Sequence, residues 1–133
     1  MNAHEFRIGN YVEIEGVIAL ILAIDSDGKE ALIETRTSKD KRIKTKISKV
    51  KPVALALKLL TERCHFDKTA RHNIGIDDYI CFLEFKEGYI SLLNCSGEVM
   101  IRFMDIRNLH QLQNLYYALK GTEMEMEEFP HLA

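Results

Sequence analysis

The stretch Arg42-Ile43-Lys44-Thr45-Lys46-Ile47-Ser48 alternates basic side chains with isoleucine and threonine at a period of two residues. In an extended strand this spacing sends the isoleucines and the threonine to one face and the three cations to the other. The wider segment 36–51 holds eight basic side chains against one acid. The eight are Arg36, Lys39, Lys41, Arg42, Lys44, Lys46, Lys49 and Lys51. We therefore predict a strand at 42–48 with an apolar inner face and a basic outer face.

Three further strand patterns precede this one. Residues 6–14 alternate apolar and polar side chains, and Glu15-Gly16 then reads as a turn. Residues 17–24 are apolar throughout, which predicts a strand covered on both faces. A turn cluster at 25–28 leads to another strand pattern at 31–35. Four short strands joined by tight turns predict a meander that curls into a small SH3-like barrel.

The rest of the chain predicts two helices and a second meander. Pro52 suits the first turn of a helix, and the apolar arc that follows extends to about Cys64. Three strand patterns follow, separated by glycine-containing turns. They cover 79–85, 89–93 and 99–103. A last helix is predicted from an N-cap at Asn108, supported by Gln111 in a capping box, to a left-handed cap at Gly121.

These patterns predict an α+β protein. Its first lobe, residues 1–51, is the β-meander or small barrel, and its second, residues 52–133, is an α+β lobe that is either separate or continuous with the first. An apolar content of 47% and a charged content of 29% are ordinary for a globular chain. Three cysteines cannot all pair within one chain, which favours reduced thiols and a cytoplasmic protein. We see no signal peptide, and no apolar run is long enough to span a membrane.

Candidate catalytic and metal-binding patterns are weak. Cys64, His65 and His72 lack the second ligand pair that a zinc site requires. The acidic turn at 25–28 resembles a calcium loop, but Arg36 stands where such a loop needs a carboxylate. No glycine-rich phosphate loop or nucleophile elbow is present. The sequence therefore predicts no enzyme, no cofactor and no metal.

Two blocks resemble a family of short, uncharacterised bacterial proteins that are often found in prophages and other mobile elements. They are Arg7-Ile8-Gly9-Asn10-Tyr11-Val12 and Leu109-His110-Gln111-Leu112-Gln113-Asn114-Leu115-Tyr116-Tyr117-Ala118-Leu119-Lys120-Gly121. The proline-led segment from Pro52 to Cys64-His65-Phe66 also resembles that family, with His65 where the family has glycine. The resemblance implies a bacterial, cytoplasmic, accessory protein, and it carries no catalytic residues.

Two functions remain open at this point. The predicted one is a non-catalytic adaptor that binds a protein partner or a second copy of itself through the last helix and the tail that follows it. Its predicted contact residues are His110, Gln113, Asn114 and Tyr117. The alternative is a nucleic-acid-binding accessory protein that uses the basic segment 36–51. Its predicted contact residues are Arg36, Lys39, Lys41, Arg42, Lys44 and Lys46. The same lysines could instead protect an edge strand from aggregation.

The segment after Gly121 is acidic, with Glu123, Glu125, Glu127 and Glu128 and no basic residue. It could fold over the basic segment, add an edge strand, dock on a partner or fray in solvent. Of these outcomes, fraying is the one we predict.

Overall fold

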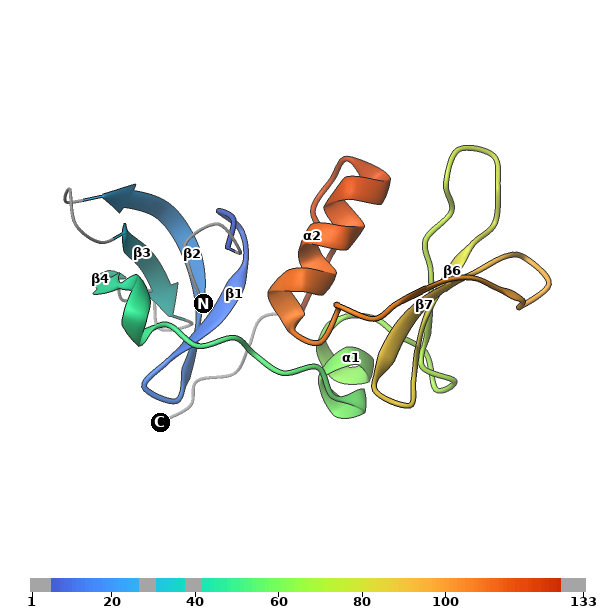
Figure 1. Cartoon of the computed structure of the whole chain (residues 1–133), viewed down its shortest axis with the longest axis horizontal. Helices are drawn as coiled ribbons and strands as arrows, with labels where there is room; N and C mark the ends of the chain where they lie inside the picture. Colours follow the sequence, from blue (N-terminus) through green and yellow to red (C-terminus); the bar gives the residue numbers. More distant parts are fainter. Residues whose placement is uncertain (1–5, 27–30, 38–41, 128–133) are drawn as a thin grey trace. The chain divides into compact units, whose positions relative to one another are not determined.

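The computed structural model describes residues 6–26, 31–37 and 42–127. They form two compact units, each built on a four-stranded antiparallel sheet (Figure 1). The first unit holds the described residues up to Val53 and also 108–114, and the second holds 54–107 and 115–127. The predicted α+β class is confirmed. The predicted boundary between residues 51 and 52 assigns all later residues to the second lobe, whereas residues 108–114 belong to the first unit.

The first sheet consists of four consecutive strands. They are β1 (Tyr11–Ile14), β2 (Val17–Ser26), β3 (Ala31–Thr37) and β4 (Arg42–Lys46), in that order across the sheet. Glu15 and Gly16 join β1 to β2, and both have positive φ angles of 51° and 81°. A two-residue turn with this geometry matches the twist of a hairpin, so the predicted turn forms. A short 3-10 helix, η2 (Ile47–Lys49), follows β4.

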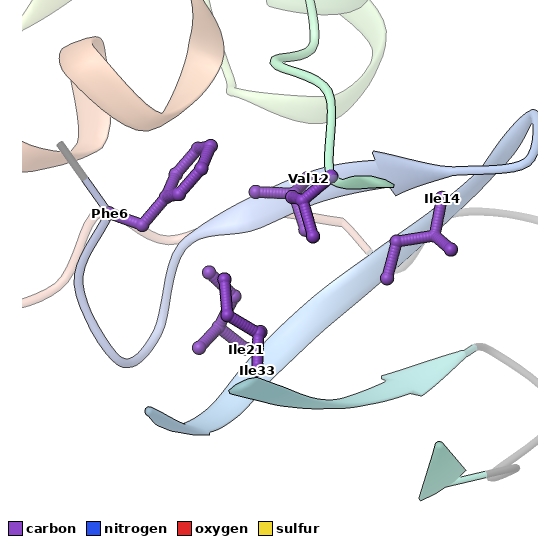
Figure 2. Packing of buried hydrophobic residues seen from close by; sticks show 6 residues of the cluster. Phe6, Val12, Ile14, Ile21 and Ile33 are labelled. Atoms are coloured by element: carbon purple, nitrogen blue, oxygen red, sulfur yellow. The ribbon is translucent and has the colours of Figure 1, made fainter. Parts of the chain in front are cut away.

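The inner face of this sheet forms the core of the first unit. Alternation along the strands places one set of apolar side chains on the same side, where they are buried. The buried cluster comprises Phe6, Val12, Ile14, Ile21, Ile33 and Val50. Five of these are labelled in Figure 2. Ile43 of β4 and Ile47 of η2 lie half-buried against the cluster, which anchors β4 to the core.

Three details of the first unit differ from the predictions. β1 begins at Tyr11 because a turn precedes it, in which the Asn10 N–H donates to the Arg7 carbonyl at 3.0 Å. β2 is not covered on both faces: Leu20 is half-buried while its neighbour Ile21 is fully buried. The sheet is open rather than a closed barrel, because β4 and β1 are its two edges and the strands between them pair only with their neighbours in sequence.

The second unit begins with a helix that is shorter than predicted. Helix α1 covers Leu57–Arg63, because Ala56 is still extended, with φ −147° and ψ 152°. The Leu55 N–H donates to the Arg107 carbonyl at 3.0 Å, a bond that holds this segment outside the helix. Proline at position 52 fits the extended backbone as well as it fits a first helical turn.

The second sheet has one strand more than predicted. Its strands are β5 (Arg71–Asn73), β6 (Phe82–Lys86), β7 (Tyr89–Leu93) and β8 (Val99–Phe103), in that order. β5 has only three residues, too few for an alternating pattern to be visible in the sequence. β6 begins three residues late because Ile76 and Tyr79 exchange two backbone hydrogen bonds of 2.9 Å and form a tight turn. The predicted strands at 89–93 and 99–103 are confirmed.

Helix α2 (Leu109–Lys120) is the longest helix of the described residues. Its first half belongs to the first unit and its second half to the second. The predicted support at its start is present, since the Asn108 N–H donates to Gln111 Oε1 at 3.0 Å. Gly121 ends it with a positive φ of 74°, as predicted. Neither α1 nor α2 combines the length and the apolar content that crossing a bilayer requires.

The prediction that the acidic tail frays is wrong as far as Glu127. Met124 is buried, and the Glu127 N–H donates to the Arg63 carbonyl at the end of α1, at 2.8 Å. The Glu127 carboxylate also lies 3.6 Å from His65 Nε2. These contacts hold the tail within the second unit.

Candidate nucleic-acid interface

Strand β4 of the first unit carries three exposed cations. Arg42, Lys44 and Lys46 are exposed, while Ile43 and Thr45 between them are half-buried. The alternation seen in the sequence therefore sorts the cations outward, as predicted, although the strand ends at Lys46 and not at 48. β4 is an edge of its sheet, so its outer side chains are bordered by another strand on one side only. We call these three residues the basic strand.

The neighbouring strand β3 modifies this charge pattern residue by residue. Arg36 lies directly opposite Arg42, and Glu34 lies directly opposite Lys44. Residues opposed in an antiparallel pair share one face of the sheet, where like charges repel and opposite charges attract. The Arg36–Arg42 pair is thus the most strongly positive point of the pattern, whereas Glu34 partly offsets Lys44.

An open hollow of about 250 Å³ adjoins the basic strand. Its lining residues come from the end of β1, the β1–β2 turn, β4 and η2: Ile14, Glu15, Ile43, Lys44, Thr45, Lys46 and Lys49. Three lysines line it, together with a single acidic residue, Glu15. Lysine ammonium groups donate hydrogen bonds and accept none, so this lining suits an anion with several oxygen acceptors, such as a phosphate group.

The remaining basic residues of the prediction have different positions. Lys39 and Lys41 lie outside the described residues. Lys49 is exposed at the hollow, and Lys51 is exposed while its backbone pairs with Glu13 of β1. Lys49 was not among the predicted contact residues. Strand periodicity does not single it out, because η2, which carries Lys49 to the hollow, interrupts that periodicity.

The predicted contact face on helix α2 requires a correction. His110 is 0% exposed and Gln113 is 2% exposed, so neither is available to a partner. The His110 ring lies 4.7 Å from the Phe6 ring, measured between centroids. Helical spacing placed His110 and Gln113 on the polar side of the helix, but this part of α2 is buried on both sides.

The polar side chains of this face have hydrogen-bond partners in the turn before β1. Gln113 Nε2 donates to the Gly9 carbonyl at 3.0 Å, and Gln113 Oε1 accepts from the Tyr11 N–H at 2.9 Å. Asn114 Oδ1 accepts from Arg7 Nε at 3.0 Å and from Asn10 Nδ2 at 2.9 Å. Of the four predicted contact residues, Tyr117 is the most exposed, at 44%.

The cysteine and histidine residues considered for catalysis are arranged for packing. Cys64 is fully buried, and its burial raises the pKa of the thiol from 9.0 to about 12. A thiol with this pKa stays protonated at neutral pH and is a poor nucleophile. His72 stacks on Phe66, with ring centroids 5.4 Å apart. Within residues 6–26, 31–37 and 42–127, no three His, Cys, Asp or Glu side chains gather in a group that could hold a metal ion.

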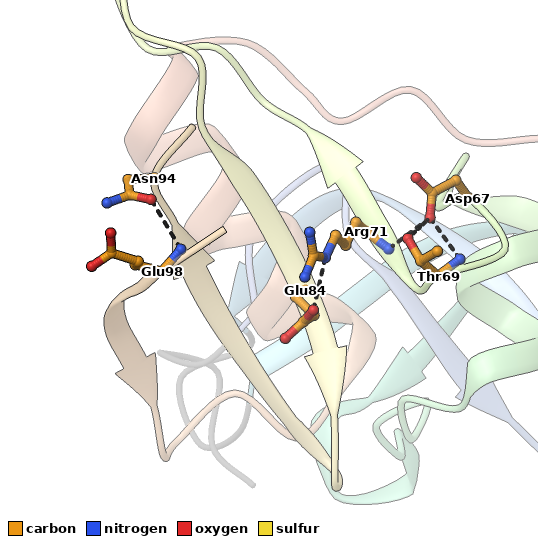
Figure 3. Close-up of polar contacts among 6 residues, drawn as sticks. All are labelled: Asp67, Thr69, Arg71, Glu84, Asn94 and Glu98. Carbon is orange, nitrogen blue, oxygen red and sulfur yellow. Dashed lines mark hydrogen bonds and ion pairs between the residues drawn. The ribbon is translucent and has the colours of Figure 1, made fainter. Parts of the chain in front are cut away.

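A polar cluster in the second unit has a structural explanation (Figure 3). Arg71 Nε donates to Glu84 Oε2 at 2.8 Å across β5 and β6. Asp67 Oδ1 accepts from the Thr69 hydroxyl at 2.5 Å and from the Thr69 and Arg71 N–H groups at 2.8 and 3.1 Å. These hydrogen bonds, that of the Thr69 hydroxyl foremost, lower the pKa of Asp67. The cluster closes the loop before β5, and its side chains satisfy one another.

Comparison with known proteins adds no further information about the site. No family model matches this chain, and neither a curated protein nor a solved structure is significantly similar to it.

Proposed function

We propose that this protein is a non-catalytic accessory protein that binds nucleic acid, with the basic strand on the phosphate backbone. One observation carries the proposal: Arg42, Lys44 and Lys46 are all exposed on the outer face of an edge strand. Side chains two positions apart on a strand are roughly 6.6 Å apart. The three cations therefore form a line about 13 Å long that can neutralise successive phosphates and release their counterions.

Two features favour a binding role over simple protection of the sheet edge. Lysines on an edge strand discourage aggregation by themselves, so edge protection does not require basic residues on neighbouring elements. Here Arg36 of β3 adds a second guanidinium opposite Arg42, and Lys49 of η2 adds a third ammonium to the hollow. Both residues increase the attraction for an anion. Neither lies on the edge strand β4, so protection of that edge does not explain them.

The proposal includes an SH3-like arrangement of the first unit. After η2 the chain returns to β1, where Glu13 and Lys51 exchange two backbone hydrogen bonds of 2.8 and 2.9 Å. This contact brings Lys51 to the edge of β1 that β2 leaves free. A short helix followed by a return to the first strand supports a small, partly closed barrel with the basic strand on its rim. An accessory role on DNA also accords with the mobile-element resemblance of the two terminal blocks.

The adaptor function is less well supported than nucleic-acid binding. It relied on four residues of α2, of which two are buried and one bonds to Arg7 and Asn10. Tyr117 by itself does not define an interface.

The test is the binding of labelled mixed-sequence DNA, measured by fluorescence anisotropy over a range of salt concentrations. With three cations engaged, we expect the logarithm of the binding constant to fall with the logarithm of salt at a slope between about −2 and −3. The double variant Lys44→Glu, Lys46→Glu should lose this binding. Its matched control is Lys58→Glu, Lys86→Glu, which changes the same number of exposed lysines in the second unit and alters the net charge equally.

Circular dichroism verifies that each variant keeps its fold. If Lys44→Glu, Lys46→Glu disturbs the sheet, the neutral double variant Lys44→Gln, Lys46→Gln is measured in its place. If the two double variants lose binding equally, the effect belongs to net charge and the proposed site is wrong. If the unaltered protein binds no DNA even at low salt, the function itself is wrong.

A further inference from the structure

The strand register aligns four side chains in one row across the first sheet. Tyr11 of β1 is opposite Leu20 of β2, Leu20 is opposite Arg36 of β3, and Arg36 is opposite Arg42 of β4. Opposed residues share a face of the sheet, so all four lie on the same face. The next residues, Val12, Ile21 and Thr35, are fully buried on the other face. We call this outer line, Tyr11–Leu20–Arg36–Arg42, the cross-strand row.

The two ends of the cross-strand row differ in chemistry. One end holds two guanidinium groups, which bind phosphate oxygens in a bidentate manner. The other end holds the phenol ring of Tyr11. Tyr11, Leu20 and Arg36 are half-buried, and Arg42 is exposed. Neighbouring strands are about 4.8 Å apart, so the row spans roughly 14 Å from Arg42 to Tyr11. This length is enough for a phosphate at one end and a base of a following nucleotide at the other.

The backbone that carries Tyr11 is held on both sides. Its N–H donates to Gln113 Oε1 at 2.9 Å, and the carbonyl of the preceding Asn10 accepts from the Ile21 N–H at 2.9 Å. Arg7 and Asn10 are in turn bonded to Asn114. A ring on a fixed backbone loses little conformational freedom when a base stacks on it, which makes it a better binding platform.

We infer that the nucleic acid bound by this protein is single-stranded and crosses the sheet along the cross-strand row, with phosphates at Arg36 and Arg42 and a base stacked on Tyr11. This inference rests on the proposed function and adds the form and path of the ligand. Bases in a duplex are stacked on one another and leave no face for a tyrosine, whereas an unpaired strand offers both phosphates and base faces. The combination of cations and an aromatic ring in one row therefore selects the single strand.

The experiment compares one labelled mixed-sequence DNA as a single strand and as a duplex, with the full chain. We expect the single strand to bind more tightly. Tyr11→Ala should weaken single-strand binding by roughly five- to 150-fold and leave duplex binding unchanged, because stacking energy is lost only with unpaired bases. Tyr11→Phe should retain the affinity of the unaltered protein. Tyr79→Ala is the matched control, since Tyr79 is 74% exposed in the second unit.

The outcomes separate this inference from the proposed function. Equal affinity for the two DNA forms, or an equal effect of Tyr11→Ala on both, overturns the single-strand inference. In that case the loss of binding in Lys44→Glu, Lys46→Glu still supports nucleic-acid binding. Binding to neither form overturns both. If Tyr11→Ala unfolds by circular dichroism, Tyr11→Leu is measured in its place, because it keeps the apolar volume and removes the aromatic ring.

Discussion

The amide group of Asn10 donates a hydrogen bond to Asn114 Oδ1 at 2.9 Å, which joins two residues that lie 104 positions apart in the chain. Asn10 is fully buried, and its own Oδ1 accepts from the Arg7 N–H at 2.7 Å. The contact therefore connects the turn before β1 to helix α2.

This hydrogen bond should appear as an energetic coupling. We expect Asn10→Ala and Asn114→Ala to be non-additive, with a coupling free energy of about 0.5–3 kcal/mol, because each removes the partner of the other. Urea unfolding of the two single variants and the double variant measures it. Asn73→Ala paired with Asn114→Ala is the control, since Asn73 belongs to the other unit. Additive effects for the Asn10–Asn114 pair would show that the contact contributes nothing of its own.

Gln113 gives a prediction that depends on pH. Gln113→Glu keeps the shape of the side chain but removes the donor to the Gly9 carbonyl, and a buried carboxylate then faces a carbonyl oxygen. We expect a loss of at least about 1–3 kcal/mol in unfolding free energy at neutral pH. Burial raises the pKa of an introduced carboxyl, so lowering the pH protonates it and restores a donor. The stability of Gln113→Glu should therefore approach that of the unaltered protein in acid. A loss of unfolding free energy that is the same at every pH would contradict this account.

Cys64 predicts a decrease of stability in alkali. Its thiol pKa is about 12 when folded against an ordinary value of 9.0. As the pH rises, the thiol therefore loses its proton in the unfolded chain before it does so in the folded protein. The contribution of Cys64 to the free energy of unfolding is complete below pH 9 and falls as the pH rises towards 12. Comparing urea unfolding of the unaltered protein and Cys64→Ala across this range isolates the effect, because other groups titrate in both. If the free energies of unfolding of the two proteins change in parallel with pH, the raised pKa of Cys64 is refuted.

Asp67 predicts a local transition in acid. Hydrogen bonds from the Thr69 hydroxyl and from backbone N–H groups stabilise its ionised form and lower its pKa below the ordinary 3.8. The contribution of the ionised Asp67 to the stability of this loop is thus present above pH 3.8. It is lost as the pH falls through the lower pKa that Asp67 has in the folded state. The amide proton signals of Thr69 and Arg71 should titrate with a midpoint below 3.8 in NMR spectra. In Asp67→Asn that titration should be absent.

The two Glu-Gly hairpin turns provide a matched pair of variants. Glu15 and Glu87 both have positive φ angles, of 51° and 55°, at a position where asparagine is favoured. Glu15→Asn and Glu87→Asn should each increase the unfolding free energy by about 0.5–1 kcal/mol. Since Glu15 alone lines the lysine hollow, its replacement should also strengthen DNA binding. Equal DNA affinities of the two variants would exclude the hollow from the interface.

Local sequence patterns were sufficient for several elements. The alternation of 42–46, the Glu15-Gly16 turn and the ends of helix α2 each depend on neighbours within a few residues. The faces of a strand and the caps of a helix follow from backbone geometry, which is the same in any fold. The local pattern alone therefore determines the outward direction of Arg42, Lys44 and Lys46.

Tertiary structure decided which helical face is buried and where extended segments end. Helical spacing assigns His110 and Gln113 to the polar side, but the turn at 9–11 supplies the partners that make burial of Gln113 favourable. The delayed start of α1 likewise follows from the bond between Leu55 and Arg107. The alignment of Tyr11 with Arg36 and Arg42 required the register of three strand pairs. Each of these results depends on groups far apart in the sequence, whose approach is set by the packing of the whole unit.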